Sequence, residues 1–139
     1  MKNELSVRLN NNKKDIRRLQ REFNKFGEIH QLPQKIFANI HVVLDEVLTN
    51  VVKYGYTDEE EHQIVVHFRL RSNMIEVEVI DDARPFNILD ADKPITQEPF
   101  EEKSIGGLGI HLVINLMDEV EYHHRKGLNQ LFLRAKIID

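Results

Sequence analysis

Two stretches of alternating residues on either side of a short turn most constrain how this chain can fold. Apolar side chains fill every second position of residues 64–70 and again of residues 75–79, and Ser72-Asn73 lies between them. This alternation predicts two half-buried strands joined as a tight hairpin. A sheet with one apolar face has to bury that face against a second layer.

Helical periodicity before the hairpin can supply the second layer. An alternating strand at residues 5–9 is followed by apolar residues at steps of three and four between Ile16 and Phe26, which indicates one amphipathic helix. Pro33 is well placed to open a second helix with a wide apolar face, which runs to about Tyr54.

The C-terminal part of the chain combines both patterns. Residues 110–117 form an apolar helical stretch, and closing strands are expected around residues 120–123 and 131–137. The predicted class is therefore α+β, a two-layer α/β sandwich in which a mixed, mostly antiparallel sheet is covered by three helices. At 139 residues the chain is expected to be a single domain over residues 1–139.

Composition narrows the classes of function. The chain is 41% hydrophobic and 30% charged and has no cysteine, which excludes a disulfide framework and a thiolate metal site. Its longest apolar run is too short to span a membrane and its N-terminus has no hydrophobic signal region, so we expect a cytoplasmic protein without a membrane partner. A net charge of −4 offers no basic field for a phosphate backbone, and nucleic acid is not an expected partner.

Glu46 and Asn50 are the first candidate functional residues. They lie four positions apart inside the second helical pattern, so both side chains project from one face of the helix. An Asn oxygen is a hard ligand for a hydrated Mg²⁺, and a Glu can polarise an attacking hydroxyl group, as a Mg-nucleotide site requires. The alternative is a solvated helix face, on which Glu, Asn and Lys commonly occur together.

Asp81 ends the inward row of the second hairpin strand, where it follows Ile75, Val77 and Val79. A carboxylate that closes a buried row needs a partner from the protein or from a ligand. Asp81 could accept a hydrogen bond from the exocyclic amino group of adenine, and this contact would select ATP over GTP. The alternative is an ordinary turn residue after a strand.

A glycine cluster lies where a long loop becomes the apolar helix, at Gly106, Gly107 and Gly109. A helix start offers unpaired amides and a positive dipole end to a phosphate, and glycine lets the backbone approach closely. Residues 87–105 before the cluster lack helical or strand periodicity, and loops of this length are often lids. The alternative is a flexible turn, since the spacing fits neither a Walker loop nor a Rossmann fingerprint.

Three boxes in this order carry a family resemblance. A Glu followed four residues later by Asn occurs in DEVLTNVVKY at residues 45–54, an Asp-x-Gly-x-Pro-Phe box reads DDARPF at residues 81–86, and a glycine box reads IGGLGIHLV at residues 105–113. MDEVEY follows at residues 117–122. Over nearly its whole length the chain resembles the anti-sigma-factor serine/threonine kinases, a branch of the Bergerat (GHKL) ATPase superfamily that also holds histidine-kinase catalytic domains.

The resemblance implies a Bergerat-type fold, ATP and Mg²⁺ as cofactors, and a flexible ATP lid at about residues 87–105. Asn50 would coordinate Mg²⁺, Glu46 would act as the general base, and Asp81 would hold the adenine amino group. The remaining cofactor-binding positions would be Ala83, Gly106, Gly107, Leu108 and Gly109, with the glycines around the phosphates. The family phosphorylates a serine on a small STAS-domain antagonist, many members also bind a sigma factor, and homodimers occur among them.

The second box departs from the family pattern at Ala83, where the family has glycine. If the backbone there is left-handed, a methyl group costs on the order of 1–2 kcal/mol, and it would also crowd the purine. Replacing Ala83 by glycine is then expected to raise ATP affinity. Arg84 on the same turn is expected to be solvated.

Two functions follow from these boxes. The leading hypothesis is an anti-sigma regulatory factor with Mg-ATP-dependent serine/threonine kinase activity toward a STAS-domain antagonist. The alternative is a protein-binding module that nucleotide modulates and that has no kinase activity. A histidine-kinase catalytic domain fits less well because no phosphoacceptor helical hairpin is expected before the domain, and a purely structural protein would not need these polar groups around one cavity.

Overall fold

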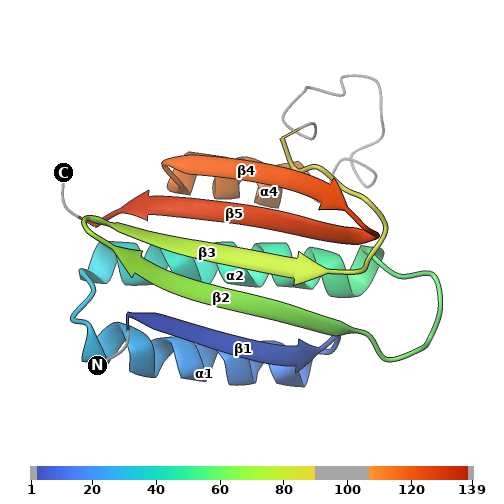
Figure 1. The fold of residues 1–139 in the computed structure, drawn as a ribbon, viewed down its shortest axis with the longest axis horizontal. Helices are drawn as coiled ribbons and strands as arrows, with labels where there is room; N and C mark the ends of the chain where they lie inside the picture. The colour runs from blue at the N-terminus through green and yellow to red at the C-terminus, as the bar shows by residue number, and fades with distance from the viewer. Residues whose placement is uncertain (1–2, 90–106, 138–139) are drawn as a thin grey trace.

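The computed structural model describes residues 3–89 and 107–137, which form a five-stranded sheet with helices on one face (Figure 1). The strand order is β1-β2-β3-β5-β4. The strands are β1 (Glu4–Asn10), β2 (Gln63–Arg71), β3 (Met74–Asp81), β4 (Glu119–Arg125) and β5 (Leu128–Lys136). The predicted two-layer α+β class is confirmed.

All pairings in this sheet are antiparallel, so the described strands form no mixed sheet. The hairpins β2–β3 and β4–β5 are antiparallel because two-residue turns at Ser72-Asn73 and Lys126-Gly127 can join only antiparallel neighbours. The predicted hairpin is therefore confirmed, and the closing strands form a second hairpin beside it.

The helices of the described residues are α1 (Lys13–Ile29), α2 (Gln34–Tyr54) and α4 (Gly107–Leu116). Asn12 caps α1, where its Oδ1 accepts the backbone N–H of Asp15 at 2.8 Å. Pro33 is the N-cap of α2 and Gly55 is its C-cap, in agreement with the predicted bounds. None of the described helices has both the length and the apolar character needed to cross a membrane.

The core lies between the sheet and the helices. The alternating residues of β2 and β3 point into it as predicted, and the ring of Phe23 on α1 stacks on the ring of Phe68 on β2 at 4.9 Å between centroids. The opposite face of the sheet is polar and is crossed by ion pairs, in which Glu76 contacts both Arg69 at 2.9 Å and Arg134 at 2.8 Å. The apolar face alone is therefore covered by a second layer.

The end of α2, the end of β3 and the beginning of β5 lie at the same end of the molecule (Figure 1). Asp81 at the end of β3 pairs in register with Asn129 near the start of β5. α4 packs beside α2 and begins at Gly107, earlier than the predicted residue 110, so Gly107 and Gly109 belong to its first turn. These elements surround the candidate site.

Candidate nucleotide site

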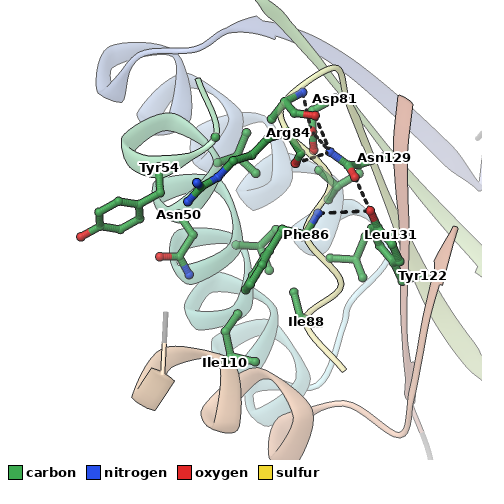
Figure 2. Close-up of a pocket in the computed structure, with 15 residues that line it drawn as sticks. Asn50, Tyr54, Asp81, Arg84, Phe86, Ile88, Ile110, Tyr122, Asn129 and Leu131 are labelled. Carbon is green, nitrogen blue, oxygen red and sulfur yellow. Dashed lines mark hydrogen bonds between the residues drawn. The ribbon is translucent and has the colours of Figure 1, made fainter. Parts of the chain in front are cut away.

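A largely apolar pocket lies between α2, the end of β3, α4 and the β4–β5 hairpin (Figure 2). Asn50 from α2, Asp81 from β3 and Asn129 from β5 are polar residues in its wall. Apolar residues from the same elements complete the wall, among them Val47, Val79, Ile110 and Leu131. A concave apolar site with a few convergent polar groups is typical of small-molecule binding.

The structure brings three of the predicted site residues to this pocket, namely Asn50, Asp81 and Ala83. Glu46 is not part of the pocket wall; it lies one helical turn before Asn50 on α2. Gly106, the side chain of Leu108 and the greater part of the expected lid lie outside the described residues. The predicted roles of these residues remain predictions.

The Asn50 carboxamide projects from α2 beside the pocket, on the side where Tyr54 and Arg84 also lie (Figure 2). Its Nδ2 atom is buried and has no hydrogen-bond partner among the described residues. Buried polar groups are usually paired, so an unpaired amide in a pocket wall indicates a group that a ligand can engage. Arg84 is exposed, as predicted, but it also lines the pocket.

The Glu46 side chain is half-buried and packs against Gly109 in the first turn of α4. A Cβ atom placed on Gly109 would lie 2.0 Å from Glu46 Oε2, so any side chain at position 109 would displace the carboxylate from this position. The contact places the acidic group at the positive end of a helix dipole. It joins the first and third sequence boxes in space.

The Asp81 side chain is buried, with a relative exposure of 4%. Its Oδ1 accepts the backbone N–H of Ala83 at 3.0 Å and the Nδ2 amide of Asn129 at 2.8 Å. Burial raises the pKa of the Asp81 carboxyl above its usual value and nearby Asp82 acts in the same direction, whereas the two hydrogen bonds oppose this rise. The hydrogen bonds from the described residues all go to Oδ1, which leaves Oδ2 as an acceptor for a ligand.

Ala83 does not have the strained backbone that its place in the second box, where the family has glycine, would imply. Positive φ angles occur among the described non-glycine residues at Gln31, Ser72 and Lys126, and not at Ala83. The Ala83 methyl is buried against Gly55, where a Cβ atom on Gly55 would lie 2.7 Å from it. The premise of a left-handed backbone at Ala83 is therefore wrong, and glycine at this position would have no backbone strain to relieve. That glycine raises ATP affinity by leaving more room for the purine stays a prediction.

Sequence reasoning missed Asn129 as a site residue, and it noted Tyr122 only as part of a family segment. Asn129 is buried and donates to Asp81, while the Tyr122 hydroxyl donates to Asn129 Oδ1 (Figure 2). The signal that could have found Asn129 is the one that found Asp81. Each is a polar residue in the inward-facing row of a strand, and the other residues of that row are apolar.

A second group of ionisable residues lies outside the pocket, in the connection between α2 and β2. Asp58, Glu60 and His62 bring three possible ligand atoms within 4.8 Å of one another. Both ring nitrogens of His62 are already within hydrogen-bond distance of carboxylates, Nε2 of Asp58 at 2.8 Å and Nδ1 of Asp82 at 3.1 Å. This arrangement is that of a hydrogen-bonded histidine, and we assign no metal to it.

The fold and the order of the three boxes define an ATPase class. The chain belongs to the family described as the histidine kinase-like ATPase domain, which matches residues 9–135.

Two curated relatives illustrate the similarity in sequence. The serine-protein kinase RsbW of Listeria innocua serovar 6a is 30% identical to this chain over 95 residues, which make up 66% of this chain and 60% of that protein. The serine-protein kinase RsbW of Oceanobacillus iheyensis is also 30% identical over 95 residues, with shares of 65% and 60%. The matched part thus spans about 60% of the length of these relatives.

Solved structures share the fold. The crystal structure of the RsbU and RsbW domains of a Mycobacterium tuberculosis protein matches 96% of this chain and 32% of that chain, with a TM-score of 0.70 and 18% identity. A histidine kinase domain from Erythrobacter litoralis matches 76% of this chain and 46% of that chain, with a TM-score of 0.55 and 20% identity. At these identities the likeness concerns the fold alone.

Proposed function

We propose that this domain is an anti-sigma regulatory factor that transfers a phosphoryl group from Mg-ATP to a serine or threonine of a STAS-domain antagonist. The observation that carries the proposal is spatial. Asn50 and Asp81 come from distant parts of the sequence and face one pocket. Glu46 lies one helical turn before Asn50 on α2, and its carboxylate contacts Gly109 in the first turn of α4. Similarity to the serine-protein kinases RsbW supports the same activity.

The pocket residues fit a Mg-nucleotide. The Asn50 amide has a buried Nδ2 without a partner among the described residues, so the carboxamide can turn its Oδ1 toward a hydrated ion. Bound Mg²⁺ would neutralise the charge of the phosphates. Gly107 and Gly109 lie in the first turn of α4, where free backbone amides would face the same phosphates.

Two carboxylates would have different tasks. Asp81 is buried in the pocket wall and keeps Oδ2 free to accept a hydrogen bond from the amino group of adenine. Glu46, near the glycine turn, would take the proton of the substrate hydroxyl. The hydroxyl oxygen would then bond to the γ-phosphorus as the bond between that phosphorus and the ADP oxygen breaks. The lid expected at residues 87–105 would exclude water, and almost all of it lies outside the described residues.

The proposal is tested with γ-labelled ATP, Mg²⁺ and a STAS-domain protein that the chain binds. We expect labelled phosphoserine or phosphothreonine on that partner, and Glu46→Gln should lower the rate by about a hundredfold or more, since general bases contribute 10²- to 10⁴-fold. Asp45→Asn is a matched control, because Asp45 is the exposed neighbour on the same helix. A partner that binds tightly but receives no phosphate would reject the kinase function.

A binding module without kinase activity is the second candidate, and Ala83 favours it. The methyl that replaces the family glycine is part of the pocket wall and narrows it relative to glycine. In this case Asn50→Ala would still capture the partner without ATP, whereas a nucleotide-dependent kinase complex would lose affinity. Binding of a sigma factor and formation of a homodimer are further predictions of the resemblance, to be tested with the same purified protein.

A further inference from the structure

Asn129 is one of the few buried polar residues of the described chain, together with Glu78 and Asp81. It is 6% exposed and lies opposite Asp81 in the β3–β5 register, with its side chain on the pocket side of the sheet. The residue would be costly to bury unless its amide were satisfied. Its contacts therefore indicate what it is for.

Hydrogen bonds fix the orientation of the Asn129 carboxamide. Nδ2 is 2.8 Å from Asp81 Oδ1, 3.0 Å from the Ala83 carbonyl and 3.2 Å from the Arg84 carbonyl. If the amide were turned over, its oxygen would face three other oxygens, so the NH₂ group must point toward Asp81. The two amide hydrogens thus hold both the carboxylate and the turn that follows β3.

Tyr122 on β4 fixes the other end of the same amide. Its hydroxyl donates to Asn129 Oδ1 and accepts the backbone N–H of Phe86 at 3.2 Å (Figure 2). The hydrogen bonds therefore run in one direction, from Phe86 through Tyr122 and Asn129 to Asp81. Each polar atom of this hydrogen-bond network has a defined donor or acceptor role, so the Asp81 carboxylate is held in one orientation.

We propose that Asn129 is a positioning residue for base recognition, which occupies Asp81 Oδ1 and thereby presents Oδ2 as the acceptor for the 6-amino group of adenine. Tyr122 supports this role by orienting Asn129. The inference rests on the proposed contact between Asp81 and adenine. It predicts that adenine specificity depends on a residue that need not touch the nucleotide.

Electrostatics add a second effect of Asn129. Burial raises the pKa of Asp81, and the hydrogen bond from Asn129 acts against this rise. Without the amide, Asp81 is both less fixed in orientation and more easily protonated. A protonated carboxyl has one acceptor fewer for an amino group.

The test compares two nucleotides in the presence of Mg²⁺, ATP and purine riboside 5′-triphosphate, which lacks the 6-amino group. Titration calorimetry should show that the wild-type protein prefers ATP, and Asn129→Leu should reduce this preference by about tenfold, the usual size for a hydrogen bond to a charged group. A variant that is merely less stable would bind both nucleotides more weakly by the same factor, so the ratio of the two affinities would not change. An unchanged ratio in folded Asn129→Leu would overturn the inference.

Gln130→Leu is the matched control. Gln130 is the next residue on β5 and its side chain is on the open face of the sheet, where Nε2 donates to Glu78 Oε2 at 2.8 Å. It should leave the nucleotide ratio unchanged. Tyr122→Phe should reduce the ratio less than Asn129→Leu, because the Asn129 amide retains its bonds to Asp81.

Asn129→Asp provides a second readout and keeps the test available if the leucine variant fails to fold. Two facing carboxyl groups share a proton more readily at low pH, so ATP affinity of this variant should recover as pH falls. An Asn129→Asp variant with the wild-type pH profile would contradict the inference.

The wild-type titrations separate this inference from the proposed function. Absence of ATP binding by the wild type would reject the proposed function. Wild-type binding without a preference for ATP over purine riboside 5′-triphosphate would reject the role of Asp81.

Discussion

Because Gly109 has no side chain, the Glu46 carboxylate can occupy the space beside it. The side-chain oxygen lies 2.0 Å from the point where a Cβ atom would be, a distance at which two atoms cannot coexist. The third box was interpreted as a phosphate cradle, in which glycine allows close backbone approach. The structure adds a different reason for glycine at this residue, which is room for the proposed general base.

We therefore expect Gly109→Ala to reduce phosphoryl transfer by on the order of a hundredfold, since displacement of a catalytic group by about 1 Å has effects of this size. The stability of the domain should change by less than about 1 kcal/mol, because the displaced group is the end of a flexible side chain. Measurement of kcat and KM separates the two roles of glycine. Displacement of Glu46 lowers kcat, whereas a lost phosphate contact raises KM for ATP.

A double-mutant cycle with Glu46→Gln checks the cause. If Gly109→Ala acts by moving Glu46, it should have little further effect on transfer once the carboxylate is gone. Effects that multiply in the double variant would show that Gly109 acts through the phosphates instead.

The C-terminal end of α2 depends on a pair of small residues from two elements. Gly55 ends the helix with φ −82° and ψ −20°, a conformation open to every residue, so its backbone does not require glycine. Space does require it, since a Cβ atom would lie 2.5 Å from the Val51 carbonyl oxygen and 2.7 Å from the Ala83 methyl. The Gly55 carbonyl also accepts the N–H of Arg84 at 2.9 Å, which ties α2 to the turn after β3.

Gly55→Ala should accordingly destabilise the domain by about 1–3 kcal/mol, the usual range for overpacking. Urea denaturation should show part of this loss restored in the Gly55→Ala, Ala83→Gly double variant, because one of the two close contacts is removed. Strict additivity of the two changes would contradict the contact. Ala83→Gly alone should not raise ATP affinity through relief of backbone strain.

At the scale of the whole molecule, one histidine joins the α2–β2 connection to the strand end beside the pocket. His62 lies between Asp58 and Asp82, its ring stacks on Tyr56 at 4.1 Å between centroids, and the Tyr56 hydroxyl donates to Asp82 at 3.1 Å. Both ring nitrogens can donate only in the protonated form. Hydrogen bonds to Asp58 and then to Asp82 raise the pKa of His62 above its usual value of 6.5.

The folded state therefore binds the His62 proton more tightly than the unfolded state does. The resulting stabilisation is fully present below pH 6.5 and is lost as pH rises through the higher pKa of the folded state. We expect the melting temperature of the wild type to exceed that of His62→Gln at about pH 6, and the difference to shrink toward pH 8. A difference that grows with pH would contradict this assignment.

The His62→Gln comparison is needed because another histidine acts in the opposite direction. Burial lowers the pKa of His41, so its folded form disfavours the proton and its contribution to stability rises with pH. The pH profile of the wild type alone would mix both groups. The difference between wild type and variant isolates His62.

Local patterns were sufficient for the elements and for part of the site. Alternation predicted β2, β3 and the inward position of Asp81, steps of three and four predicted α1 and α2, and Pro33 indicated where α2 begins. Spacing also placed Glu46 and Asn50 one turn apart on one helix. These predictions succeeded because periodicity and capping depend on neighbours within a few residues.

The strain expected at Ala83 could not be judged in this way. The family glycine in the second box suggests a left-handed residue at position 83, but the backbone angle there depends on how the turn after β3 packs against Gly55. The sheet is predicted to be mixed but mostly antiparallel, and all pairings of the described strands are antiparallel. The local patterns do not decide this point, because the order and direction of strands that are distant in sequence follow from packing.

The sequence by itself determined the α+β class, the extents of the main helices and strands, and the residue types available for a nucleotide site. Only the tertiary structure decided that Asn129 faces Asp81, that Glu46 fills the space at Gly109, and that Ala83 fits against Gly55. The physical reason is that each of these contacts joins residues from different elements. Their distances depend on β-sheet register and helix packing, which no local pattern specifies.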